Sequence, residues 1–377
     1  MTGANPQLDS GNSPAIVVLG LFPPPVTGAA KNTLLFLEDL KACGLDVVGI
    51  NTAAGGTALD RSARYHLRRL RQFLINRKRL RSASDGARST RLYFVPDGGL
   101  GLWYSAGYAQ IARSRFDHVT LHHRTFQYID RPSKAMGRIC AMLAGKITHV
   151  FLSEGMKQRF FAVYGEQPAI VCTNARYVEP RVPQKPDDRL VIGHLGNLCA
   201  AKGFFEVADC FEALRARGIP VELQLAGPVV EAPVQQRLNE LQTIHGDAVH
   251  YHGPVHGDAK DRFYDRLHVF LFATHWPQEA QPNVVYEAYA GGAAVVANAR
   301  GCIAEMIDEG AGHLVTAPDR FVAQGVDFCA SYWDRRDLIP ENTRSLAAKM
   351  EDLRELSVSQ HSNKFRLVTG VEGADDT

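Results

Sequence analysis

Apolar runs alternate with helix-like segments along most of the chain. The first run, residues 15–22 (AIVVLGLF), is continuously apolar, and residues 29–44 after it have a helical pattern that ends at Gly44. Similar apolar runs follow, namely LDVVGINT, RLYFVPD, DHVTLHH and THVFLS. Apolar strands separated by helices predict a parallel sheet that is covered by helices on both faces.

A proline-rich segment interrupts this alternation. Residues 179–189 (EPRVPQKPDDR) hold three prolines and six charged residues, which is typical of a linker. The alternation restarts at LVIGHLGN and continues to GHLV. We therefore predict an α/β protein with two doubly wound, Rossmann-like domains facing a cleft, where ligands bind beyond the carboxyl ends of the strands. The predicted parts are a flexible N-terminus (1–14), a first domain (15–178), a linker (179–189), a second domain (190–340), and a C-terminal helix and partly disordered tail (341–377).

The composition is that of an ordinary soluble protein. Of the 377 residues, 45% are hydrophobic and 22% are charged. The sequence has no apolar run of about 18 residues that would span a bilayer. Its N-terminal residues lack the basic-then-apolar order of a secretory signal. The seven cysteines occur singly, without C-x-x-C spacing. We expect a protein of the reducing cytoplasm.

The net charge of +2 is unevenly spread along the chain. Residues 61–81 hold nine Lys and Arg and no acidic residue. Ala63, Leu67, Leu70 and Leu74 form one helical seam within this segment. Such a basic amphipathic helix can lie on anionic lipid, peripherally at the inner membrane. The alternative is a solvated helix whose seam packs on its own domain.

Two predicted strand ends in the first domain carry candidate ligand-binding residues. The loop PPPVTGAAKNT contains Thr27 and Gly28 before a helix start, where free N–H groups favour anions. A full G-x-G-x-x-G is absent, which argues against a nicotinamide enzyme. After the strand DHVTL come His122, His123 and Arg124. A histidine at such a position can share a proton near neutral pH.

The second domain offers a turn suited to phosphate. Gly196 and Asn197 follow the strand LVIGHL, and Lys202 stands at the entrance of the next helix. A lysine added to a helix N-terminus suits a phosphate or pyrophosphate.

Two carboxylates lie eight positions apart in the segment HWPQEAQPNVVYEAYAGGAAVV. Pro282 predicts a helix over about Asn283 to Ala290. Glu279 therefore lies in the loop before this helix, and Glu287 lies inside it, where it can accept hydrogen bonds from a ribose diol. The N–H groups of Asn283 and Val284 can meet phosphate.

No metal site is predicted. His250, His252 and His256 have H-x-H-x₃-H spacing, but no carboxylate is expected to complete the set. The chain has no D-x-D motif, so we do not expect a divalent cation held by carboxylates.

Several of these motifs together resemble one family. EAQPNVVYE resembles the E-x₇-E motif of the retaining glycosyltransferases of family 4, which have the GT-B fold, and GNLCAAKG resembles their phosphate-binding turn. PPPVTGAAKNT resembles their N-terminal glycine loop, and VFLSEGMKQRF the segment before their interdomain crossing. GGLGLWYSA…LHHRTFQYID looks like members that build bacterial surface polysaccharides. The resemblance covers about residues 15 to 335.

The resemblance implies roles for the donor-side residues. Glu279 would face the donor sugar, Glu287 would hold the ribose, and Lys202 would bind the diphosphate together with Gly196 and Asn197. Backbone N–H groups of Asn283 and Val284 would also contact the donor.

On the acceptor side, the resemblance implies that His122 is the functional histidine, with His123 as the fallback. Thr27, Gly28 and Arg124 would line the acceptor or phosphate loop. The chain departs from the family at Asn197, where an arginine is frequent. Arg124 or Arg300 could supply the missing cation.

These residues predict a metal-independent hexosyltransferase that needs no cofactor. It would transfer a sugar with retention from a nucleotide diphosphate sugar to a glycan or lipid-linked acceptor at the inner face of the membrane, and it would not bind nucleic acid. Two alternatives stay open: a catalytically silent GT-B scaffold protein, which the Asn197 departure favours, and a nucleotide-sugar epimerase.

Overall fold

The computed structural model describes residues 15–24, 27–53, 63–85 and 90–370, and these residues form two compact units. Unit 1 consists of residues 1–174 and 359–377, and unit 2 consists of residues 175–358. The predicted flexible N-terminus and the last seven residues of the predicted tail lie outside the described residues. Each unit contains one six-stranded sheet in which all neighbouring strands are parallel, as the alternating pattern predicts.

The sheet of unit 1 has the order β2-β1-β3-β4-β5-β6. Its register pairs Ile16 of β1 with Val47 of β2 and with Arg91 of β3. Apolar side chains from β1 and α1 pack against Val368 near the C-terminal end of α13. The strands are β1 (Ala15–Gly20), β2 (Val47–Asn51), β3 (Thr90–Phe94), β4 (His118–His122), β5 (Ile147–Phe151) and β6 (Ala169–Val171). The helices are α1 (Gly28–Ala42), α2 (Ala63–Ser82), α3 (Leu102–Arg115, preceded by the 3₁₀ turn η1, Gly99–Gly101), α4 (Gln127–Asp130), α5 (Lys134–Leu143) and α6 (Glu154–Tyr164).

The sheet of unit 2 has the order β12-β11-β10-β7-β8-β9 and carries a large apolar core. The strands are β7 (Leu190–Leu195), β8 (Val221–Ala226), β9 (Val249–Tyr251), β10 (Val269–Phe272), β11 (Ala294–Asn298) and β12 (Gly312–Val315). The helices are α7 (Phe204–Ala216), α8 (Ala232–His245), α9 (Asp258–Arg266), α10 (Asn283–Ala290), α11 (Ile303–Met306) and α12 (Phe321–Asp334). Short 3₁₀ turns are η2 (Ala175–Tyr177), η3 (Ala200–Lys202), η4 (Gly246–Ala248), η5 (Pro318–Arg320) and η6 (Arg336–Leu338).

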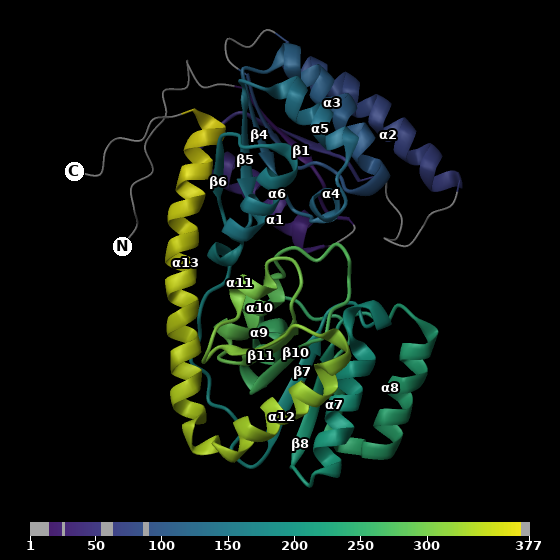
Figure 1. Ribbon diagram of the computed structural model, residues 1–377, viewed down its shortest axis with the longest axis vertical. Coiled ribbons are helices and arrows are strands. Elements are labelled where there is room, and N and C mark those ends of the chain that lie inside the picture. Colours follow the sequence, from purple (N-terminus) through teal and green to yellow (C-terminus); the bar gives the residue numbers. More distant parts are fainter. Residues whose placement is uncertain (1–14, 25–26, 54–62, 86–89, 371–377) are drawn as a thin grey trace, which may run out of the picture. The chain divides into compact units, whose positions relative to one another are not determined.

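The last helix, α13 (Ile339–Thr369), contributes residues to both units (Figure 1). Its residues up to Val358 belong to unit 2, and those from Ser359 belong to unit 1. The helix begins two residues before the predicted C-terminal segment.

The proline-rich segment 179–189 packs on unit 2. The Lys185 ammonium donates to the backbone carbonyls of Asp265 at 3.0 Å and Leu267 at 2.6 Å, and also to that of Gly291. Burial lowers the pKa of Lys185 to about 7, against the opposing charge of Asp265. The Arg181 guanidinium donates to Asp265 at 2.8 Å. The segment is therefore not only a linker, because its side chains also form hydrogen bonds with unit 2.

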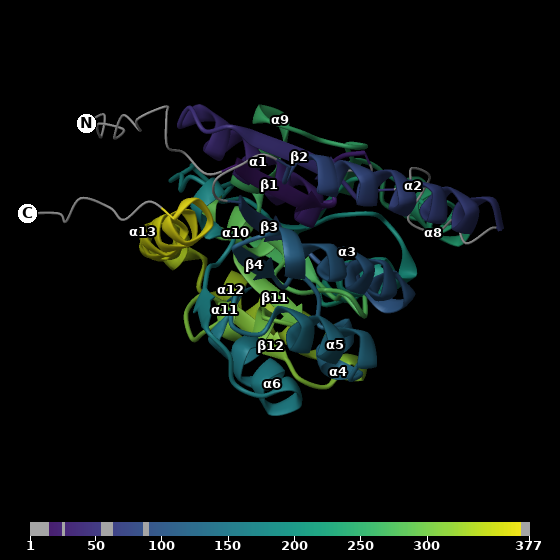
Figure 2. The ribbon, with the colours of Figure 1, turned by 90° about the horizontal axis from the view of Figure 1, so that it is seen from above.

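Helix α2 packs on α3, which lies between α2 and α5 (Figure 2). The side of α2 that faces unit 1 includes Arg69, Phe73, Asn76 and Leu80. The alternative that the leucine seam packs on its own domain is therefore wrong, because Leu67, Leu70 and Leu74 are 69%, 44% and 54% exposed. Arg61 and Ser62 of the basic segment lie outside the described residues.

No helix in the described parts of the chain is both long enough and apolar enough to cross a membrane.

Candidate functional site

The turn after β7 holds Lys202 in a fixed place in unit 2. Lys202 ends η3, and Gly203 follows it with a φ of +85°. A Cβ at Gly203 would lie 2.5 Å from the carbonyl oxygen of Ala273, just after β10. Only glycine satisfies both the left-handed backbone and this close approach. A hydrogen bond also joins this turn to the loop after β10. The His275 N–H in that loop donates to the Ala201 carbonyl at 2.9 Å.

Lys202 forms an ion pair with Glu279, the first of the two predicted carboxylates. Both side chains are largely shielded, at 21% and 12% exposure. The Lys202 ammonium also lies 5.8 Å from the ring centres of Phe272 and Trp276, within the range of a cation–π contact. The Thr274 hydroxyl donates weakly to Glu279 at 3.5 Å. The structure thus brings together two residues that are 77 positions apart in the sequence.

The loop that carries Glu279 is braced by the turn after β11. Arg300 Nε donates to the Trp276 carbonyl at 2.8 Å, and the Cys302 N–H donates to the Ala280 carbonyl at 2.8 Å. Gly301 has a φ of +55°, and a Cβ there would lie 2.5 Å from the Glu279 carbonyl oxygen. Arg300 is therefore the candidate substitute cation that lies beside the Glu279 loop.

Helix α10 spans Asn283–Ala290, as predicted, with Pro282 as its N-cap. Glu287 pairs with Lys260 of α9 at 2.6 Å, and their side chains are 12% and 18% exposed. Burial raises the pKa of Tyr264 well above its ordinary value, and the charge of Glu287 adds to this. Sequence reasoning missed Lys260, because a lysine in the first turn of a highly charged helix carries no motif signal.

The other predicted donor residues lie at the carboxyl ends of β7 and at the start of α10. Gly196 approaches Gly227, whose φ is +118° and whose Cβ would overlap the Gly196 carbonyl. Asn197 is exposed. Asn283 and Val284 are the first two residues of α10 and are partly buried.

His194 is a further residue of this region that the sequence did not single out. It is fully buried in β7, and its Nδ1 lies 2.9 Å from the Leu271 carbonyl. Burial lowers its pKa to about 4, and the charge of Lys202 contributes in the same direction. The His194 imidazole is therefore neutral near pH 7.

In unit 1, the loop before α1 has the predicted capped start. The Thr27 hydroxyl is the N-cap of α1 and accepts from the Ala30 N–H at 3.1 Å. Gly28 is the first residue of that helix.

His122 ends β4 and is 1% exposed. Its Nδ1 lies 2.5 Å from the Tyr93 hydroxyl, and that oxygen accepts from Arg124 at 3.5 Å. The Tyr93 hydroxyl can both donate and accept, so this contact forms with either tautomer of His122 and leaves Nε2 as the other ring nitrogen. This buried Nε2 has no hydrogen-bond partner among the described residues. Burial lowers the pKa of His122 well below its ordinary value, and the charges of Arg124 and Lys364 contribute.

His123, the fallback histidine, occupies a different environment. Its Nδ1 lies 2.9 Å from the Tyr128 hydroxyl and its Nε2 lies 2.7 Å from His149 Nδ1. Its ring stacks on Phe151 with centres 4.5 Å apart. Both nitrogens are thus used inside a buried aromatic cluster. The Arg124 guanidinium donates to the Asn174 side chain at 3.3 Å and to the Tyr93 hydroxyl at 3.5 Å.

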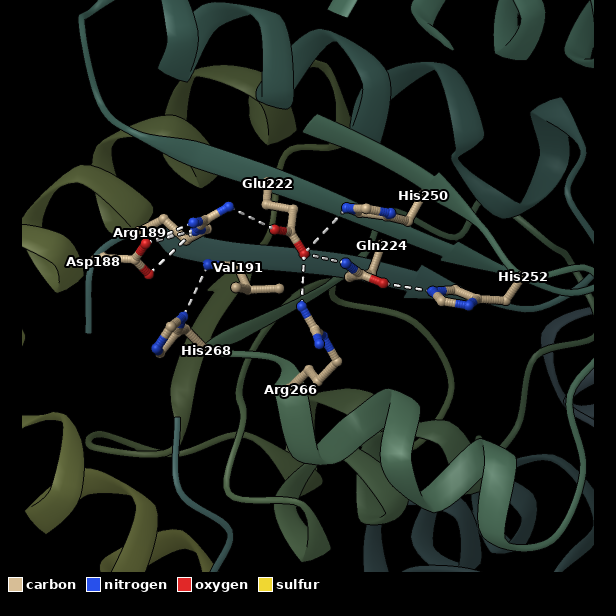
Figure 3. A network of polar contacts seen from close by, with 9 residues as sticks. All are labelled: Asp188, Arg189, Val191, Glu222, Gln224, His250, His252, Arg266 and His268. Carbon is tan, nitrogen blue, oxygen red and sulfur yellow. Dashed lines mark hydrogen bonds and ion pairs between the residues drawn. The ribbon is translucent and has the colours of Figure 1, made fainter. Parts of the chain in front are cut away.

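His250 and His252 of the H-x-H-x₃-H stretch belong to a polar network that includes Glu222 and Gln224 of β8. Glu222 lies 3.5 Å from His250 Nε2 (Figure 3). His252 Nε2 lies 2.5 Å from Gln224, which donates in turn to Glu222. The cations that contact Glu222 are Arg266 at 3.2 Å and Arg189 at 3.4 Å. Two arginines thus balance the Glu222 charge. Within the described ranges, no group of three or more His, Cys, Asp or Glu is arranged to hold a metal ion.

Part of the chain matches a known protein family. Residues 189–330, which contain Lys202, Lys260 and both carboxylates, match the family described as "Glycosyl transferases group 1". None of the curated proteins compared matches the chain.

Solved structures extend the likeness to both units. The chain is similar to Alr3699/HepE of Anabaena in complex with UDP, with 17% identity, 92% of this chain and 99% of that chain covered, and a TM-score of 0.62. It is also similar to sucrose-phosphate synthase of Thermosynechococcus elongatus, with 16% identity, 94% and 100% coverage, and a TM-score of 0.66. At these identities the likeness shows the fold alone, and that fold is GT-B, with two Rossmann-like domains.

Proposed function

We propose that this protein is a retaining glycosyltransferase of family 4. It transfers a hexose from a nucleotide diphosphate sugar to a glycan or lipid-linked acceptor in bacterial surface polysaccharide synthesis. The observation that carries the proposal is the shielded pair Lys202–Glu279 at the carboxyl ends of β7 and β10. It lies within the segment that matches the glycosyltransferase family.

In the proposed reaction, the bond between the anomeric carbon and the diphosphate breaks, and a bond to the acceptor oxygen forms on the same face. The acceptor hydroxyl proton is released with the nucleoside diphosphate. Negative charge grows on the leaving diphosphate, where Lys202 and the first turn of α10 stabilise it. Glu279 faces the donor sugar, and Glu287, oriented by Lys260 at 2.6 Å, accepts hydrogen bonds from the ribose.

We propose a UDP-sugar as the first donor to test, because Alr3699/HepE is described in complex with UDP and with UDP-glucose. On the acceptor side, we assign His122 rather than His123. The buried Nε2 of His122 has no hydrogen-bond partner among the described residues, whereas both nitrogens of His123 are used. The Nε2 atom of His122 would form a hydrogen bond with the acceptor.

A catalytically silent scaffold is the second candidate, and the exposed Asn197 favours it. Product analysis separates the possibilities. We would incubate UDP-, GDP- and ADP-sugars with the protein, with and without bacterial lipid-linked glycans, in the presence of EDTA. The proposal predicts nucleoside diphosphate and a product that keeps the anomeric configuration. An isomerised donor would indicate an epimerase instead, and an inert Glu279→Gln control beside an inert wild type would indicate the scaffold.

A further inference from the structure

Helix α2 presents an outward face on which leucines and cations alternate. Leu67, Leu70, Leu74 and Ile75 are 69%, 44%, 54% and 38% exposed. Their spacing places them on one side of the helix. The exposed cations of the same helix are Arg64, Arg68, Arg71, Lys78, Arg79 and Arg81. The sequence of α2 contains no acidic residue.

The opposite side of α2 fixes the helix on unit 1. Arg69 pairs with Asp97 at 2.9 Å, with side chains 14% and 18% exposed. Phe73 packs on Tyr104 with ring centres 4.9 Å apart. The Asn76 amide donates to the Asn51 carbonyl at 2.7 Å. Polar and aromatic side chains, together with Leu80, therefore lie on the packed side, while Leu67, Leu70 and Leu74 are left in solvent.

This arrangement is the reverse of an ordinary surface helix, whose apolar stripe faces the core. Contiguous exposed apolar side chains mark interaction sites. Interleaved leucines and arginines match a bilayer interface, where apolar side chains enter the headgroup–acyl boundary and cations meet anionic headgroups. A nucleic acid backbone would satisfy the arginines only and would gain nothing from the leucines.

We propose that the outward face of α2 docks on an anionic lipid bilayer, with Leu67, Leu70 and Leu74 inserted and the flanking cations on the headgroups. This surface is independent of the donor site, so it can be tested apart from glycosyl transfer. It would hold the protein at the membrane where a lipid-linked acceptor is found.

The test is co-sedimentation of the full chain with vesicles of phosphatidylcholine alone and of equal parts phosphatidylcholine and phosphatidylglycerol. We expect binding to the anionic vesicles only. Arg68→Gln with Arg71→Gln should weaken it about tenfold. Leu67→Ser with Leu70→Ser and Leu74→Ser should remove the part of the binding that resists high salt.

Matched controls separate this face from general surface effects. Arg262→Gln with Arg344→Gln removes two exposed cations from unit 2, and Ile244→Ser removes a residue of α8 that is 67% exposed. Both controls should bind vesicles like the wild type. Unchanged binding of the leucine variant, with its fold verified by circular dichroism, would overturn the proposal. So would equal binding to neutral vesicles, or selective binding to duplex DNA.

Discussion

The two units place opposite charge arrangements at the carboxyl ends of their sheets. In unit 2, both candidate lysines have carboxylate partners, Lys202 with Glu279 and Lys260 with Glu287. In unit 1, His122 lies near the cations Arg124 and Lys364. Burial is the main reason why the pKa of His122 is lowered, and the charges of these two residues lower it further. Lys364 is itself 3% exposed and lies 4.2 Å from the Phe36 ring centre.

This difference suggests different tasks for the two units. A neutralised pair can exchange partners, so that a diphosphate replaces Glu279 at Lys202 and frees the carboxylate to face the sugar. A neutral, buried histidine beside two cations, with one ring nitrogen that has no partner among the described residues, instead fits the acceptor-side role that we propose. The predictions below test each half of this contrast, beginning with the largest effect.

Replacing Lys202 should abolish most of the activity. Lys202→Met removes the cation that we propose for the leaving diphosphate, and it also removes the ion-pair partner of Glu279. We expect turnover to fall about 10²–10³-fold, measured as nucleoside diphosphate release with a saturating UDP-sugar. Lys41→Met, an exposed lysine of α1, is the matched control and should keep full activity. Comparable activity of the two variants would contradict the role of Lys202.

The adjacent histidines should respond differently to phenylalanine. His123→Phe breaks the contacts with Tyr128 and His149 and should lower the free energy of unfolding by about 2 kcal/mol, because buried partners lose hydrogen bonds. His122→Phe also removes a buried hydrogen bond, but should in addition lower transfer to the acceptor while leaving slow donor hydrolysis unchanged. Urea unfolding and the two assays check this. Equal loss of hydrolysis and transfer in His122→Phe would refute an acceptor-side role.

Glu279→Gln should have opposite effects on binding and on catalysis. Without the carboxylate, Lys202 is available to the diphosphate, and UDP affinity should rise about tenfold, since a charged competitor is removed. Turnover should fall, because the donor sugar loses its facing carboxylate. Isothermal titration calorimetry measures the first effect. Weaker UDP binding by this variant would show that Glu279 helps to hold the nucleotide.

Stability should decline in mild acid, because three buried histidines must stay neutral. Burial lowers the pKa of His149, His194 and His268 to about 4 from 6.5. His268 Nδ1 accepts from the Val191 N–H at 2.8 Å (Figure 3), so a proton there would break the bond. Below pH 6.5 the unfolded chain binds more protons, and stability is lost as the pH falls towards about 4.

The expected loss is on the order of 1 kcal/mol per histidine at about pH 5.5. It can be measured by urea unfolding from pH 7.5 to 5, with His268→Gln as a variant that should flatten the slope. A stability that does not change over this range would contradict the neutral assignment.

Periodicity and turn residues predicted most of the architecture, but not the role of every face. Pro282 and the glycines after Ala290 fixed the limits of α10, because each acts locally. The leucine seam of α2 left open whether it meets lipid or packs on its own domain, and Gln72, Phe73 and Asn76 make the contacts with the domain instead. Their partners, Asn51 and Tyr104, come from distant elements that a local pattern does not contain.

The site shows the same division between local and distant information. Lys202 and Glu279 could be singled out from their turns, whereas Lys260 could not, because its importance comes only from contact with Glu287 in another helix. Similarly, Glu222 meets His250 only through the pairing of β8 with β9.

The most direct test of the central claim is UDP binding measured by calorimetry in EDTA, with wild type and Lys202→Met compared. The account predicts that the wild type binds UDP without a divalent cation and that Lys202→Met binds at least about tenfold more weakly, as expected for the loss of a charge-assisted contact. Equal affinity of a folded Lys202→Met variant, or binding by the wild type only when a divalent cation is added, would contradict it.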